Sequence, residues 1–177
     1  MIMVILIIAI ILPTVFSILY VILQQQLKVS RIIKTKQQGD VILSFIKEKV
    51  TRNAVSIKDS SSNVKCANVN DSYSSTSGSD FIFVDNSSPS SDFNISLSSG
   101  ILSYTGRLQT GAGIVTVGLH DSSVGISNFA ISCYKKNGNS KALVSITYNI
   151  SPNDNAFASF SQGQITLPYQ TVILMRN

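Results

Sequence analysis

Apolar side chains dominate the first 23 residues of the chain, and the first charged residue is Lys28. Only Pro13, Thr14, Ser17 and Tyr20 interrupt this run. At ~1.5 Å per residue a helix of this length reaches ~35 Å, and the hydrocarbon core of a bilayer is ~30 Å thick. Because lipid offers no hydrogen-bond partners, such a segment must pair its backbone groups within a helix. The pattern therefore predicts a transmembrane helix over residues 1–23.

A cleaved export signal is the alternative to a retained anchor. The apolar run is longer than the core of a typical signal peptide, which has about 7–15 residues, and no small-x-small cleavage motif follows it. Residues 24–28, Gln-Gln-Gln-Leu-Lys, instead continue in a helical pattern. These features favour a retained anchor.

The helical pattern extends beyond residue 23, with its apolar positions confined to one side. Among Lys, Arg and Gln, apolar residues recur every three or four positions at Leu27, Ile32, Ile33, Val41, Ile42, Phe45, Ile46 and Val50. This spacing is typical of an amphipathic helix with one buried face. We therefore expect residues 24–54 to continue the same helix, with Ile42, Phe45, Ile46 and Val50 packing against the rest of the chain.

From Val55 onward the apolar pattern changes to a period of two, which indicates strands. The expected strands are 55–58, 64–69, 80–85, 93–97, 101–107, 113–117, 126–135, 142–150 and 164–176. Serine-rich segments 70–79 and 86–92 are expected to be loops, and Pro168 indicates an edge strand or a break. Residues 55–177 thus form one antiparallel β domain, called the head below. The predicted fold class is α+β, with a long N-terminal transmembrane and amphipathic helix packed on this sheet.

The positive charge of the chain is concentrated next to the apolar run. Eight of the 14 Lys and Arg residues lie between Lys28 and Lys58, whereas the head from Asp59 onward is nearly neutral. A nucleic-acid-binding protein would carry its positive charge on the folded domain. Anionic lipid headgroups are a simpler partner for this stretch, and a solvated helix face explains it equally well.

Cys66 and Cys133 are the two cysteines of the chain. In an exported domain they would form a disulfide, closing a loop of about 67 residues and stabilising the fold by ~4 kcal/mol. In a cytoplasmic domain both would stay reduced. The positive flank at residues 28–36 favours a cytoplasmic head. The head is rich in Ser, Asn and Thr, however, and we give this composition more weight, so we expect an external head with a disulfide.

A search for catalytic groups finds little. His120, the single histidine, adjoins Asp121 and Ser122, but sequence neighbours rarely face each other as a triad requires, and no Gly-x-Ser-x-Gly motif is present. Glycoside hydrolysis would need a carboxylate pair from the polar loops, since Glu48 is the only glutamate. Oxygen-bearing side chains suited to calcium occur at Asn68, Asn70, Asp71 and Asp80, without EF-hand spacing. We therefore expect a protein that is not an enzyme and has no cofactor or metal.

The arrangement and several local segments resemble type IV pilins and type II secretion pseudopilins, especially the J-type minor pseudopilins. Residues 3–13 are similar to the apolar part of the N-methylated segment, and residues 24–57 are similar to its helical continuation. Residues 126–133 and the closing residues 168–177 add a looser likeness in the head. The overall plan covers the whole chain, and the specific signal lies in its helical part.

The resemblance implies a non-enzymatic subunit of a type II secretion or type IV pilus-like filament. It places the chain in the bacterial cytoplasmic membrane as a single-pass protein with its head outside the cytoplasm. The implied partners are membrane lipid and other pilin-like subunits, with no nucleic acid. The implied membrane or filament-core residues are Val4, Ile5, Leu6, Ile8, Ile11, Leu12, Pro13, Phe16, Leu19 and Leu23.

One departure from the family concerns the processing motif Gly-Phe-Thr-Leu-x-Glu, which does not occur in the sequence. Two explanations stay open: the motif and a basic leader precede Met1, or the chain is anchored without prepilin processing. In the second case the alternative function is a single-pass anchored β-sandwich module that binds a ligand at the cell surface. Such a module would need a flexible linker between anchor and head, where the sequence predicts a helix.

Overall fold

A computed structural model describes residues 2–86, 92–108, 113–153 and 165–175 of the chain. The chain divides into two compact units, residues 1–34 and residues 35–177, and each is described by itself. Helix α1 extends from Ile2 to Asn53. Its residues up to 34 form the described part of the first unit, and its residues from 35 onward belong to the second unit together with the strands.

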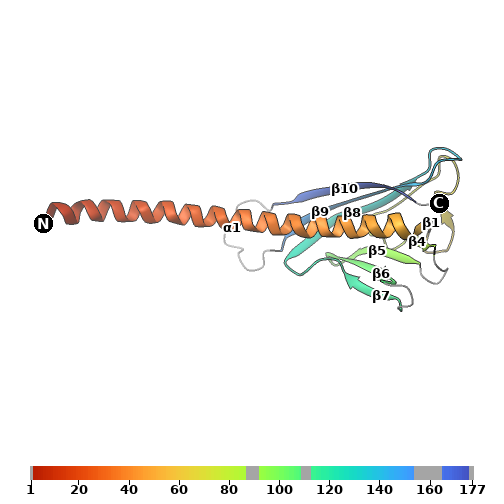
Figure 1. The fold of residues 1–177 in the computed structure, drawn as a ribbon, viewed down its shortest axis with the longest axis horizontal. Coiled ribbons are helices and arrows are strands. Elements are labelled where there is room, and N and C mark those ends of the chain that lie inside the picture. Colours follow the sequence, from red (N-terminus) through yellow and green to blue (C-terminus); the bar gives the residue numbers. More distant parts are fainter. Residues whose placement is uncertain (1, 87–91, 109–112, 154–164, 176–177) are drawn as a thin grey trace. The chain divides into compact units, whose positions relative to one another are not determined.

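The strands of the second unit form two antiparallel sheets (Figure 1). The six-stranded sheet has the order β2-β1-β4-β5-β6-β7, and the four-stranded sheet has the order β10-β9-β8-β3. The strand bounds are β1 Ala54–Lys58, β2 Val64–Lys65, β3 Ser72–Ser75, β4 Ile82–Asp85, β5 Phe93–Ser98, β6 Ile101–Gly106, β7 Val115–Gly118, β8 Val124–Tyr134, β9 Leu143–Pro152 and β10 Leu167–Leu174. An apolar N-terminal helix with antiparallel sheets confirms the α+β class.

One predicted loop is wrong. The segment 70–79 was expected to be a loop because of its serines, yet Ser72–Ser75 form β3 and pair with residues 131–134 of β8. The pairing is favourable because Tyr73 alternates with the serines and stacks on Phe81, with ring centroids 5.5 Å apart. Of the second predicted loop, residues 87–91 lie outside the described part of the chain.

Pro168 lies in an edge strand, as its missing N–H predicts. β10 is the last strand of the four-stranded sheet, and Pro168 faces Asn149 of β9 in an unbroken register. The alternative of a break at Pro168 is therefore wrong. Gln164 and Arg176, the expected ends of this strand, lie outside the described residues.

The core of the second unit lies between α1 and both sheets (Figure 1). Side chains from all three contribute to one cluster of buried residues. Its members include Ile42, Ile46 and Val50 of α1, Ile57, Phe83, Phe93, Ile95 and Tyr104 of the six-stranded sheet, and Ile131, Val144, Ile146, Tyr148 and Ile150 of the four-stranded sheet. Burying each such side chain contributes about 1.5–3 kcal/mol, so the helix is integral to the core of this unit.

A bulge in β8 directs one further ring into this core. The register with β9 shifts between Ser127 and Ala130, where Asn128 adopts a φ of 52°. The extra residue places Phe129 on the inner face, where it is 2% exposed. Its ring lies against Gly78, at which a Cβ would overlap both Phe129 and the carbonyl oxygen of Ile95.

Cys66 and Cys133 form a disulfide, the state that the sequence favours. Both residues are buried, and the bond connects the residue after β2 to β8. It therefore links the six-stranded sheet to the four-stranded sheet. Closing a loop with a sequence separation of 67 residues stabilises the folded state by ~4 kcal/mol on the chain-entropy model.

Candidate functional site: the apolar helix and its packing on the head

The first unit exposes the apolar side chains of α1. Side chains that the sequence assigns to a membrane or filament core are between 49% and 62% exposed, namely Ile8, Ile11, Leu12, Phe16, Leu19 and Leu23. Pro13 is also exposed, and the side chains of Val4, Ile5 and Leu6 lie outside the described part. Leaving apolar surface in water costs about 25 cal/mol per Å². Exposing this many apolar side chains to water is therefore unfavourable.

By length and composition α1 can cross a membrane. Its most apolar 18-residue window has a mean hydropathy of 2.0 and no buried residues. The helix lies near the N-terminus, and it is the one helix among the described residues that meets these criteria. These properties fit a single-pass membrane anchor.

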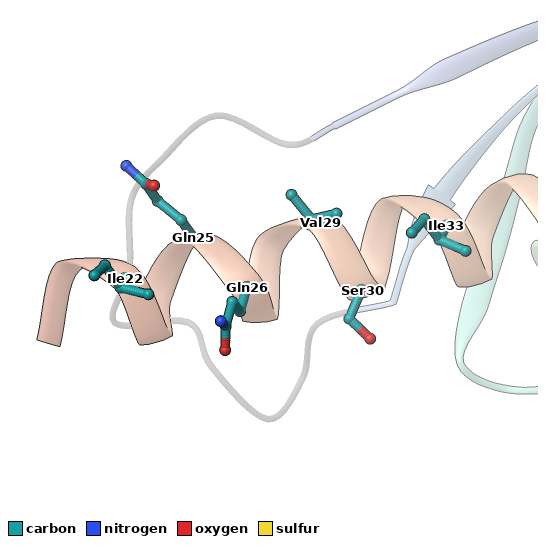
Figure 2. A pocket seen from close by; sticks show the side chains of 6 residues that line it. All are labelled: Ile22, Gln25, Gln26, Val29, Ser30 and Ile33. Atoms are coloured by element: carbon teal, nitrogen blue, oxygen red, sulfur yellow. The ribbon is translucent and has the colours of Figure 1, made fainter. Parts of the chain in front are cut away.

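A shallow hollow follows the apolar stretch on one side of the same helix (Figure 2). Its lining comes from positions three or four residues apart, namely Ile22, Gln25, Gln26, Val29, Ser30 and Ile33. None of these side chains ionises near neutral pH, and none is a nucleophile activated by a neighbouring base. The hollow therefore offers polar and apolar contact surface and no catalytic group.

In the second unit, α1 buries one face. Ile42, Ile46 and Val50, spaced by four residues, are each completely buried. Phe45 is half-buried, and its ring meets Tyr104 of β6 edge-on at 5.3 Å between centroids. The Lys49 ammonium lies 5.7 Å from the centroid of the Tyr104 ring and donates a hydrogen bond to the Leu108 carbonyl. These contacts join the helix to the six-stranded sheet.

Two tyrosines join the helix to the four-stranded sheet. The Tyr148 hydroxyl of β9 donates to the Gly39 carbonyl at 2.9 Å, and the Tyr169 hydroxyl of β10 donates to the Lys36 carbonyl at 3.0 Å. The two rings stack with centroids 5.2 Å apart. A Cβ at residue 39 would overlap the Tyr169 ring, so the glycine allows this close approach of the ring to the helix.

Burial keeps these hydroxyls protonated. Burial raises the pKa of Tyr148 and of Tyr169, and the negative charge of the nearby Asp40 carboxylate raises both pKa values further. The pKa of Tyr104 is raised to about 12, again mainly by burial. A phenol with a raised pKa remains a hydrogen-bond donor throughout the physiological range. The contacts between the tyrosines and helix carbonyls are therefore stable to ordinary changes of pH.

The His120 side chain is held in place by hydrogen bonds to the backbone. Its Nε2 accepts a hydrogen bond from the Leu102 backbone N–H at 3.1 Å, so its Nδ1 carries the proton and donates to the Asp121 carbonyl at 2.9 Å. The Asp121 carboxylate accepts instead from the backbone N–H and hydroxyl of Ser123. Both ring nitrogens of His120 are therefore engaged by backbone groups.

Two of the four candidate calcium ligands, Asn70 and Asp80, use a side-chain oxygen in another contact. Asn70 Oδ1 accepts from the Tyr134 hydroxyl, and Asp80 Oδ1 accepts from the Ser79 hydroxyl. The backbone N–H of Asp71 donates to the Asn68 carbonyl. Among the described residues, no group of three or more His, Cys, Asp or Glu side chains could hold a metal ion.

Comparison with protein-family models, curated proteins and solved structures finds no match for this chain. The interpretation of the site therefore depends on its geometry. Sequence reasoning selected the buried helix face but did not identify Gly39, Tyr148 and Tyr169. A glycine within a helical pattern was the available signal, because it often marks a close approach of another element.

Proposed function

We propose that this chain is a non-enzymatic, membrane-anchored subunit of a pilin-like filament, a minor pilin or pseudopilin of a type II secretion or type IV pilus-like system. The observation that carries the proposal is the change of environment along α1. The large apolar side chains from Ile8 to Leu23 are exposed, whereas Ile42, Ile46 and Val50 are completely buried. One helix thus supplies both a surface for lipid or other helices and part of the core of the head.

The exposed apolar part of α1 indicates how such subunits would assemble into a filament. Lipid tails are as apolar as the side chains of the helix, so helices leave lipid for one another through van der Waals packing rather than hydrophobic burial. The residues from Val4 to Leu23 would make these contacts in a filament core, with the heads forming an outer layer. Pro13 removes one helical hydrogen bond within this stretch, which allows the helix to bend there.

The packing of the helix on the head supports this function over an anchored surface-binding module. A binding module needs a flexible connection so that its head can reach a ligand. Here residues 35–53 are helical, and Ile42, Ile46 and Val50 are part of the core. The head and this part of the helix therefore move as one body.

The proposed location is the bacterial cytoplasmic membrane, with a single pass and with the head outside the cytoplasm. The Cys66–Cys133 disulfide supports an external head, because disulfides persist in oxidising compartments. The proposed partners are membrane lipid and other pilin-like subunits. No cofactor takes part in this function.

The experiment that tests the proposal is mass spectrometry of the mature N-terminal peptide, taken from the membranes of cells that express the native gene. We expect an N-methylated residue, followed by a Thr-Leu-x-Glu-type sequence ahead of Met1. The matched control is a strain that lacks the prepilin peptidase, in which the methylated peptide should disappear. An unmodified mature chain beginning at Met1 would overturn the proposal.

A further inference from the structure

Three cations follow the apolar stretch of α1 and lie on one side of the helix. Lys28, Arg31 and Lys34 are three residues apart, and all of them belong to the first unit. Because an α-helix turns by about 100° per residue, steps of three residues keep them within an arc of about 120°. Lys28 and Lys34 are exposed, and Arg31 is half-buried. These three residues are called the basic face below.

The basic face and the hollow lie on opposite sides of this segment of α1. The hollow is lined by uncharged residues, among them Ile22, Val29 and Ile33 (Figure 2). At about 100° per residue, the centre of its lining is roughly 170° around the helix from Arg31, the central residue of the basic face. Within the first unit, the helix therefore has a positively charged side and an uncharged side.

No acidic residue close by in the sequence neutralises the basic face. Asp40 is the first acidic residue of the chain, six positions after Lys34. Among the described residues, neither Lys28 nor Lys34 has an acidic side chain within ion-pair distance, whereas Arg52 of the same helix is 2.9 Å from Glu48. The basic face therefore carries positive charge that is available to an anionic partner outside the chain.

The distance from the apolar stretch places the basic face at a membrane surface. Leu23 ends the first apolar run, and at ~1.5 Å per residue Lys28 and Lys34 lie about 8 and 17 Å farther along the helix axis. The Cα–Cβ bonds of a helix tilt toward its N-terminus, so these long side chains extend back toward the apolar run. Headgroups occupy about 5–8 Å outside the hydrocarbon core, and charges attract over a further ~8–10 Å at moderate salt.

We infer that the basic face binds the headgroups of anionic phospholipids, so that these lipids gather on one side of α1 at the membrane surface. Their phosphate oxygens accept charge-assisted hydrogen bonds from Lys and Arg, and their net negative charge complements the three cations. The uncharged hollow on the opposite side offers no such contact. The inference rests on the membrane anchoring in the proposed function and deepens it by naming the class of lipid.

The test measures which lipid surrounds each side of the helix. The chain contains no tryptophan, so a single introduced tryptophan reports on one position. Leu27, about 40° around the helix from Arg31, and Val29, in the hollow, are 61% and 54% exposed. The full chain with Leu27→Trp or with Val29→Trp is reconstituted into vesicles of equal parts phosphatidylglycerol and phosphatidylcholine. One of the two lipids is brominated in each sample, because bromine quenches nearby tryptophan fluorescence.

The ratio of quenching by the two brominated lipids gives the local preference for phosphatidylglycerol over phosphatidylcholine. We expect a preference of about fivefold at Leu27→Trp, the factor expected from one cation near the headgroups, and of about one at Val29→Trp. Replacing all three residues of the basic face by glutamine should reduce the preference at Leu27→Trp to about one.

A matched control removes the same three charges from exposed lysines of the second unit, by Lys47→Gln, Lys136→Gln and Lys141→Gln. This control should keep the preference at Leu27→Trp. The inference is overturned, and the filament proposal is left in place, if the preference is about one at Leu27→Trp, is equal at Leu27→Trp and Val29→Trp, or survives loss of the basic face. Absence of quenching by either lipid at both positions would instead overturn the membrane anchoring, and both proposals with it.

Discussion

Among single residues, Asp59 is the one whose contacts depend most clearly on a charged side chain. Its carboxylate accepts hydrogen bonds from the backbone N–H groups of Asn63 and Ser61 and is 3.1 Å from the Lys65 ammonium. The Asn63 backbone N–H is the largest cause that lowers the pKa of Asp59 from 3.8 to about 2, with the Asn63 amide and Lys65 adding to it against the opposing effect of burial. The charged carboxylate therefore holds the turn between β1 and β2.

We predict that Asp59→Asn lowers the unfolding free energy at neutral pH. A lowered pKa in the folded state means that the stabilisation is fully present above pH 3.8 and is lost as the pH falls through about 2. The stability difference between the two proteins should therefore shrink over this window. Unfolding in denaturant at a series of pH values measures it. A difference that stays constant down to pH 2 would show that the charge is unimportant.

Gly39 is the second residue whose identity the structure explains. An alanine in the middle of a helix is ordinarily more stable than glycine by about 0.5–1 kcal/mol. Here its methyl group would overlap the Tyr169 ring, and overpacking typically costs about 1–3 kcal/mol. We therefore predict that Gly39→Ala lowers the unfolding free energy by about 1–2 kcal/mol.

The control for Gly39→Ala is the same substitution in a Tyr169→Ala background. With the ring removed, the helix propensity of alanine should dominate, and Gly39→Ala should then stabilise the protein by about 0.5–1 kcal/mol. Denaturant unfolding of the four proteins completes a double-mutant cycle. Equal effects of Gly39→Ala in both backgrounds would contradict the proposed contact.

Among the secondary-structure elements, the sequence predicted the ones whose apolar pattern can be seen within a few neighbouring residues. The period-two alternation in residues 142–150 corresponds to β9, and the spacing of Ile42, Ile46 and Val50 corresponds to the buried face of α1. It did not predict β3, because three serines resemble a loop until β8 provides a hydrogen-bonding partner. The bulge at Asn128 was also unpredicted, since it depends on the register between β8 and β9.

The docking of α1 on the sheets can be tested with two aliphatic residues of that helix. Ile46 is completely buried, whereas Val41 is 62% exposed. Ile46→Ala removes buried methyl groups and leaves a cavity, so it should lower the unfolding free energy by about 3 kcal/mol. Val41→Ala should change it by less than about 0.5 kcal/mol. Denaturant unfolding in detergent micelles compares the variants, and similar effects at both positions would contradict this packing.

For the whole molecule, composition was sufficient to predict a helix long and apolar enough to cross a membrane, but not how this helix joins the head. The apolar character of α1 is a sum over neighbouring residues, so it can be read from the chain directly. The hydroxyls of Tyr148 and Tyr169 instead reach helix carbonyls 109 and 133 positions earlier. Contacts at such separation depend on the complete topology of both sheets, which a local pattern does not contain.

The anchoring role of α1 can be tested with two matched pairs of lysines. Leu12 and Phe16 lie within the apolar stretch, whereas Val29 and Ile33, with the same spacing and similar exposure, lie beyond it. A lysine at the centre of a spanning helix costs about 3 kcal/mol, so Leu12→Lys with Phe16→Lys should prevent stable insertion. Val29→Lys with Ile33→Lys should preserve it, because lysines near the end of a span extend toward the headgroups. Extraction of membranes with alkaline carbonate separates embedded from peripheral protein. If the Leu12 and Phe16 variant remains embedded as fully as the Val29 and Ile33 variant, residues 8–23 are not the anchor.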